Sequence, residues 1–231
     1  MSEATQRERE RAAEEAASLV EAGMWVGLGT GRTADLFIAA LGRRVESGLA
    51  IKGAVATSER SARAGRAAGL QIADMLTEHA PRSVDLAVDG ADELDDRLRL
   101  IKGGGASLLR EKIVARMAKR FVVIADRAKH VETLGAFPLP IEVVPFGYRA
   151  TMEAVEAATG VAPSLRSAET GPLVTDNGNF IVDCAFGAIA DPEALAHRLS
   201  SVVGVVEHGL FLKEADEAVI GTGDAVTRLS R

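Results

Sequence analysis

"MWVGLGTGRTADLFIAALGRRV", from Met24 to Val45, passes from a short apolar run through a glycine-rich turn into a segment with helical periodicity. A strand, glycine turn and helix in this order open an α/β fold. The turn has Arg32 where the dinucleotide fingerprint needs its third glycine, and it lacks the Gly-Lys-Ser/Thr of a P-loop. Its backbone N–H groups can instead bind a phosphate at the helix N-terminus, although such a turn can also serve only close packing.

The segments around this unit continue the alternation of strands and helices. Before it, residues 5–21 place alanines at helical spacing among charged residues, which predicts an amphipathic helix. After it, we expect strands at 50–58, 84–90 and 121–126 and helices at 59–69 and 106–120. The last residues suggest a strand at 217–221 that returns to the same sheet, then a short helix at 224–231. The pattern predicts a Rossmann-like parallel sheet with helices on both faces.

A second pattern begins after Pro138. It reads as a strand at 141–145, a helix at 151–158, two β-rich runs around Asn177-Gly178, a helix at 192–203 and a strand at 204–211. This β-α-β-β-α-β order is that of a ferredoxin-like α+β unit. We therefore predict two domains, a Rossmann-like catalytic domain of residues 1–131 and 207–231 and a smaller inserted α+β domain of residues 132–206.

Composition narrows the setting. Of the 231 residues 47% are hydrophobic, but no apolar run approaches the roughly 18 residues that span a bilayer, and the N-terminus lacks the apolar region of a secretory signal. The net charge of −6 argues against nucleic acid as a partner. The single cysteine, Cys184, fits a reducing compartment and reads as a buried strand residue. We expect a cytoplasmic protein without membrane or nucleic-acid partners.

Polar residues follow four of the expected strands. Ligands of open α/β sheets bind outside the carboxyl ends of the strands. There the chain carries Gly29–Thr33, Thr57–Glu59, Asp89–Asp92, and Asp126 with Lys129. Hydroxyls, amides, carboxylates and an ammonium would thus face one crevice, which suits a small phosphorylated molecule.

The crowded carboxylates of "VDGADELDD", Val88–Asp96, invite a metal interpretation. Their spacing does not fit a calcium-binding loop, while a magnesium ion at Asp89 and Asp92 is an open alternative. The four histidines show no ligand spacing. We expect Glu93, Asp95 and Asp96 to be solvent-facing turn residues.

Glu111 is the most informative carboxylate. On the expected helix its neighbours are small or apolar, so its carboxylate would be partly desolvated and its pKa raised toward that of a general base. Lys102 could then offset a negative charge that develops nearby. The alternative is an ordinary surface glutamate with a helical neighbour.

Several blocks of the chain together resemble those of the type A ribose-5-phosphate isomerases. These blocks are "GLGTGRTA", "VDGADELD", "IKGGGASLLREKIVA", "IADRAKHVETLGAFPLPIEVVPF" and "VTDNGNFIVD". They occur in the family's order and cover nearly the whole chain. The resemblance implies an interconversion of D-ribose 5-phosphate and D-ribulose 5-phosphate in the pentose phosphate pathway. It also implies no metal, no cofactor, and a homodimer or homotetramer.

Carried over by position, the resemblance makes Glu111 the base that moves a proton between C2 and C1 through an enediol(ate). It gives Asp89 and Asp92 a part in ring opening and proton transfer, and Lys102 the stabilisation of the enediolate. The implied substrate-binding residues are Thr30, Gly31, Arg32, Thr33, Gly90, Ala91, Gly103, Gly104, Gly105 and Lys129. Arg9 stands where the family often has a basic residue. Arg32 departs from the family, which usually has serine there, and this difference bears on substrate binding rather than on the reaction class.

Two other functions fit the same kind of fold. A sugar-phosphate sensor would bind without turnover, but it normally needs an effector module, and no helix-turn-helix precedes Trp25. A related sugar-phosphate deaminase or lactonase would keep the glycine turn but would not need the DGADE and KGGG blocks.

Overall fold

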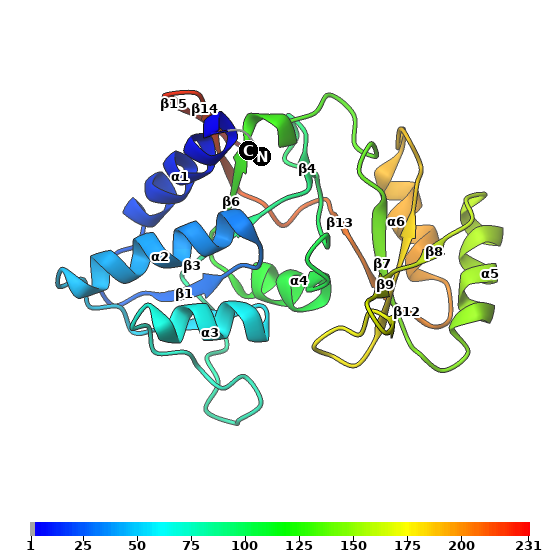
Figure 1. The fold of residues 1–231 in the computed structure, drawn as a ribbon, viewed down its shortest axis with the longest axis horizontal. Coiled ribbons are helices and arrows are strands. Elements are labelled where there is room, and N and C mark those ends of the chain that lie inside the picture. The colour runs from blue at the N-terminus through cyan, green and yellow to red at the C-terminus, as the bar shows by residue number, and fades with distance from the viewer. Residues whose placement is uncertain (1–2) are drawn as a thin grey trace.

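The computed structural model describes residues 3–231, and its largest element is a six-stranded sheet. The order is β15–β14–β6–β3–β1–β2, with all neighbours parallel except the antiparallel pair β14 and β15 (Figure 1). The strands are β1 (Trp25–Leu28), β2 (Gly53–Ala56), β3 (Leu86–Gly90), β6 (Phe121–Asp126), β14 (Glu217–Thr222) and β15 (Ala225–Ser230). The predicted Rossmann-like sheet is present. Every strand except the edge strand β15 is buried along most of its length, because both faces of the sheet are covered.

Helices pack on both faces of this sheet, as predicted. The helices are α1 (Glu3–Ser18), α2 (Arg32–Glu46), α3 (Glu59–Ala67) and α4 (Leu108–Met117). Residues of α1 and α2 form one core cluster with strand residues on the facing side of the sheet, such as Leu28 and Val88. Residues of α4 form another with Ala87 and Val123 on the opposite face. That face also carries a three-stranded antiparallel sheet of β4 (Glu93–Leu94), β5 (Leu100–Ile101) and β13 (Leu210–Phe211).

The smaller unit is a four-stranded antiparallel sheet in the order β12–β7–β11–β8. Its elements are β7 (Leu139–Val143), α5 (Tyr148–Thr159), β8 (Ser164–Leu165), β11 (Phe180–Cys184), α6 (Pro192–Ser200) and β12 (Val205–His208). A short pair, β9 (Ser167–Ala168) with β10 (Gly171–Pro172), lies between β8 and β11. This is the ferredoxin-like arrangement that the element order predicts. Cys184 is buried on β11, as expected, and burial raises the pKa of its thiol to about 12.

One sequence-based expectation about the C-terminal part is wrong. Residues 225–230 form the strand β15 rather than a helix, and Gly223 with a φ of 62° makes the tight hairpin turn that joins it to β14. The division into domains is still a prediction; the expected boundary at 206/207 falls inside β12, and residues 1–2 lie outside the described part.

The first helix is tied to the last strands. Gly221 of β14 lies so close to α1 that a Cβ atom there would stand 2.0 Å from the carbonyl oxygen of Glu8. The N–H of Gly223 donates to Glu8 Oε1 at 3.0 Å, and Arg228 of β15 pairs with Glu15. Segments more than 200 residues apart thus form one packed layer. Among the described helices none is long and apolar enough to cross a membrane.

Candidate active site

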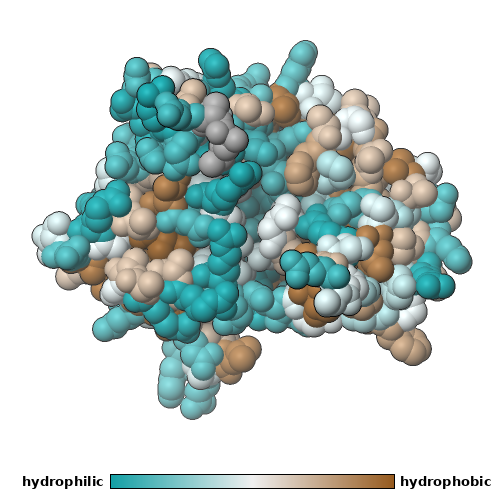
Figure 2. Space-filling model, viewed as in Figure 1, coloured by the Kyte–Doolittle hydropathy of each residue, from teal (hydrophilic) through white to brown (hydrophobic). Residues whose placement is uncertain are grey.

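A pocket of about 330 Å³ lies at the carboxyl ends of the parallel strands, against the loop that follows β5. On the face shown in Figure 2, hydrophilic residues gather in the hollow between the larger and the smaller unit. Predicted residues that line the pocket are Arg9, Thr30, Gly31, Arg32, Thr33, Gly90, Ala91, Asp92, Lys102, Gly103, Gly104, Gly105, Glu111 and Lys129. Asp89 is not among the lining residues but contacts Lys102 directly behind them. The pocket is also lined by Ala34, Arg60 and Phe137, which no sequence motif had indicated.

Lys102 is the centre of the charged cluster. Its ammonium lies 3.0 Å from Asp89 Oδ2 and 3.3 Å from Glu111 Oε2, and it donates to the carbonyl oxygen of Gly90. The side chains of all three charged residues are 3 to 4% exposed. Burial opposes the charge of Lys102, but the attraction of Asp89 and Glu111 outweighs burial and raises its pKa. Lys102 is therefore a fixed positive charge between two carboxyl groups.

Glu111 enters the cluster from the first turn of α4. Within residues 3–231 its buried Oε2 atom makes no hydrogen bond of acceptable geometry, although it lies within ion-pair distance of Lys102. Burial, and then the negative charge of Asp89, raise the pKa of Glu111 to about 8, against the attraction of Lys102. A carboxyl group with such a pKa can take up and return a proton near neutral pH. The expected desolvation of Glu111 is present in the structure.

Asp89 is held at the end of β3 by the glycine turn. Its Oδ1 accepts from the N–H groups of Thr30, at 3.0 Å, and Gly90, at 2.7 Å, while Oδ2 faces Lys102. A Cβ atom on Gly29 would stand 2.1 Å from Asp89 Oδ1, so only glycine fits beside this carboxylate. Burial raises the pKa of Asp89, although Lys102 pulls it down.

Asp92 and the glycine loop form the opposite wall. Asp92 Oδ2 accepts the N–H of Gly104 at 2.7 Å. Gly103 has a φ of 108°, in the left-handed region that favours glycine, and it packs against Leu108 and Pro140. The glycines thus bring bare backbone to the pocket wall beside the charged cluster.

Buried hydroxyls support the glycine turn from below. Thr30 Oγ1 lies 2.7 Å from Thr57 Oγ1 and 2.8 Å from Ser58 Oγ, and Ser61 extends the network from the first turn of α3. Thr57, Ser58 and Ser61 are all buried. The sequence placed Thr57 and Ser58 at a strand end but gave no signal of their contact with Thr30, because the two segments are 27 or more residues apart.

Two cations reach the pocket rim from other elements. Arg9 of α1 is buried, and its Nε donates to Asp126 Oδ2 at 2.7 Å, which fixes Arg9 at the end of β6. Lys129 follows in the short 3₁₀ helix η1 (Arg127–Lys129), with its ammonium 5.8 Å from the centre of the Phe137 ring. Together with exposed Arg32 they make this end of the pocket suited to an anion.

The carboxylates after Asp92 differ from expectation. Glu93 and Asp95 are buried rather than solvent-facing; Glu93 accepts the N–H groups of Gly135 and Phe137, and Asp95 pairs with Arg99 and caps its own turn. Only Asp96 is exposed, and it pairs with His130. The two N–H donors to Glu93 lie 42 and 44 residues away in the chain, so the local sequence does not reveal these hydrogen bonds.

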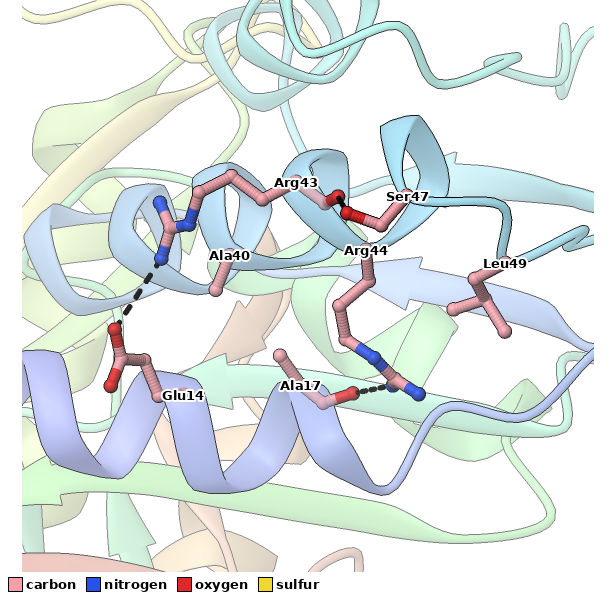
Figure 3. A pocket seen from close by; sticks show the side chains of 7 residues that line it. All are labelled: Glu14, Ala17, Ala40, Arg43, Arg44, Ser47 and Leu49. Atoms are coloured by element: carbon pink, nitrogen blue, oxygen red, sulfur yellow. Dashed lines mark hydrogen bonds and ion pairs between the residues drawn. The ribbon is translucent and has the colours of Figure 1, made fainter.

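Two other kinds of site were considered, a metal site and a second ligand pocket. In residues 3–231 no group of three or more histidine, cysteine or acidic side chains is arranged to hold a metal ion. A second hollow, of about 420 Å³, lies between α1 and α2 (Figure 3). There Arg44 donates to the carbonyl oxygens of Ala17 and Val20, and Arg43 pairs with Glu14, so the arginines serve to join the two helices.

Comparison with known proteins points to a single family. The sequence profile of the family described as Ribose 5-phosphate isomerase A (phosphoriboisomerase A) matches residues 53–225. The chain is 50% identical over 230 residues to the ribose-5-phosphate isomerase A of Thermomicrobium roseum, covering 98% of this chain and 95% of that one. It is 54% identical over 222 residues to that of Methylorubrum extorquens, covering 94% and 92%.

Solved structures agree. A D-ribose-5-phosphate isomerase in complex with phospho-erythronic acid has a TM-score of 0.91 at 37% identity, covering 98% of this chain and 99% of that one. The ribose 5-phosphate isomerase A of Methanocaldococcus jannaschii has a TM-score of 0.91 at 38% identity, covering 98% and 100%.

Proposed function

This chain belongs to the ribose 5-phosphate isomerase A family, and on that premise we propose how its own residues carry out the reaction. The enzyme is an aldose–ketose isomerase that interconverts D-ribose 5-phosphate and D-ribulose 5-phosphate. The observation that carries the mechanism is the buried cluster of Lys102 between Asp89 and Glu111 at the pocket wall.

The proposed base is Glu111. In its ionised form it removes the C2 proton of the open-chain aldose, and electrons move onto the carbonyl oxygen to give an enediolate. Moving the O2 proton to O1 and returning the abstracted proton to C1 completes the ketose. The raised pKa of Glu111 makes both halves of this transfer accessible near neutral pH. The Lys102 ammonium supplies a fixed positive charge for the enediolate oxygen, and Asp89 and Asp92 serve ring opening and proton transfer among the sugar oxygens.

The proposed phosphate end of the site is the rim near Thr30, Gly31, Arg32 and Thr33, with Lys129. A turn at the start of α2 offers N–H groups and hydroxyls, and Arg9 and Arg32 add positive charge. Gly90, Ala91 and the three loop glycines would line the sugar. The relative that binds phospho-erythronic acid, a sugar acid phosphate, supports a ligand of this chemistry.

The first experiment is a coupled assay of ribulose 5-phosphate formation, with and without a chelator. Turnover that a chelator leaves unchanged is expected; absence of turnover would refute the isomerase function, and loss on chelation would refute a metal-free mechanism. Glu111→Gln should abolish turnover while calorimetry still detects binding of phospho-erythronic acid. Glu156→Gln, on the exposed part of α5, is the matched control. Normal turnover by Glu111→Gln would show that another group is the base.

Setting and assembly complete the proposal. The family implies a place in the pentose phosphate pathway, and we propose a cytoplasmic homodimer or homotetramer without cofactor, membrane or nucleic-acid partners. The net charge of −6 supports the last point. Phe146 and Val203, each 92% exposed in the smaller unit, support an intersubunit contact there. Analytical ultracentrifugation tests the assembly, and a monomer at micromolar concentration would refute it.

A further inference from the structure

Arg166 connects the smaller unit to the glycine loop of the site. It lies between β8 and β9, and its Nη1 donates to the carbonyl oxygens of Gly103, at 2.8 Å, and Gly104, at 3.2 Å. Its Nε donates to Asp183 Oδ2 at 2.8 Å, and its Nη2 pairs with the other oxygen of the same carboxylate. The guanidinium therefore binds a carboxylate on one edge and the loop backbone on another.

Arg166 is also held in place by hydrogen bonds of its own backbone. Its N–H donates to the carbonyl oxygen of Ile181 at 2.9 Å, and its own carbonyl accepts from the N–H of Leu173 at 2.8 Å. Asp183 lies on the paired strand β11, and the two side chains are 17% and 19% exposed. A charge pair that is mostly shielded and fixed at both backbones can hold a neighbouring loop in one position.

The glycine loop needs such support. Ala106, at its end, has a φ of 58°, a left-handed conformation that residues with a Cβ rarely adopt. The Gly103 carbonyl accepts from both Ala106 N–H, at 3.0 Å, and Arg166. The described chain has no cis peptide bond. Because the C=O and N–H of a trans peptide point in opposite directions, Arg166 fixes the N–H of Gly104 toward Asp92 while it holds the two carbonyls.

We propose that Arg166, oriented by Asp183, is a positioning residue for the isomerisation, because it fixes the Gly103–Gly105 backbone and with it Lys102 and Asp92. This inference rests on the proposed function. Arg166 does not line the pocket, so it acts through the loop and not on the substrate. It also gives Asp183, in the "VTDNGNFIVD" block, a task that the proposed mechanism otherwise leaves unexplained.

The test compares Arg166→Met, Arg166→Lys and Asp183→Asn with the parent enzyme by steady-state kinetics and thermal unfolding. Displacement of a catalytic group by about 1 Å can cost about 100-fold in rate, so Arg166→Met should lower kcat by about 10- to 100-fold. Its KM should change by less than about 3-fold, because the phosphate end is untouched. Arg166→Lys keeps the positive charge but not the planar guanidinium that binds two partners, and should recover part of the lost kcat. Arg149→Met, an exposed arginine on α5, is the matched control.

The outcomes separate the two levels of the proposal. A parent enzyme without turnover refutes the proposed function. An active parent with a folded Arg166→Met variant of normal kcat refutes the positioning role, even if the variant melts at lower temperature. Should Arg166→Met not fold, normal kcat in both Arg166→Lys and Asp183→Asn refutes the role, and a lowered kcat in either supports it.

Discussion

Removing the charge of Asp89 should make Glu111 a stronger acid. Both carboxylates touch the Lys102 ammonium, at 3.0 and 3.3 Å, so their nearest oxygens are at most about 6 Å apart. Two unit charges at about 6 Å interact by about 3 kcal/mol at an effective dielectric constant of about 20. That energy corresponds to about two pKa units. We expect Asp89→Asn to lower the pKa of Glu111 from about 8 to about 6.

The assay is the pH dependence of kcat/KM, which reports the ionisation of the free enzyme. The acid limb, where Glu111 becomes protonated, should shift down by about two pH units in Asp89→Asn even though the absolute rate falls. The substrate phosphate titrates identically in both enzymes and cancels in the difference. NMR titration of a ¹³C-labelled Glu111 carboxyl gives the same pKa without turnover. Asp96→Asn, which removes an exposed carboxylate, should leave the limb in place. An acid limb that stays put or moves up in Asp89→Asn would refute the proposed coupling.

Three further predictions concern stability and packing. The pKa of Glu111 is raised from 4.5 to about 8 on folding, so its contribution to stability is complete below pH 4.5 and is lost as pH rises through 8. Glu111→Gln should therefore raise the melting temperature, relative to the parent, more at pH 9 than at pH 5; an equal effect at both would contradict this. Gly29→Ala should cut kcat/KM by about 100-fold or more while circular dichroism stays native, because the new Cβ displaces Asp89; parental activity would exclude the clash. Lys112→Met should lower the free energy of unfolding by about 3 kcal/mol in urea titrations, since Lys112 is buried with partners Glu207, at 2.8 Å, and the His208 carbonyl, at 2.7 Å; an unchanged midpoint would show that the pair is dispensable.

Much of the fold was predictable because the sequence signals were local. The Met24–Thr33 segment, the alternation of strands and helices and the element order of the smaller unit each depend on short-range periodicity and turn residues. The site residues could be predicted to lie close together because parallel strands place their carboxyl ends at one edge of the sheet.

The misses arose where long-range contacts decide the outcome. Residues 225–230 carry Val226 and Leu229 at helical spacing, but the Gly223-Asp224 turn signalled a hairpin and pairing with β14 decided the strand. Glu93 was predicted to be a solvent-facing turn residue because the backbone N–H groups that donate to its carboxylate lie more than 40 residues away. Arg166 gave no sequence signal for the same reason.

The packing of α1 on β14 has a consequence for the order of folding. Arg9, at the pocket rim, belongs to α1. The adjacent residue Glu8 is held against β14 by Gly221 and by Gly223, which lies 215 residues away in the chain. During synthesis α1 and α2 can pack together early, but the contacts of α1 with β14 form only after β14 has left the ribosome. The proposed anion-binding rim is thus expected to be completed only at the end of folding, and closure of so long a loop should make that step slow.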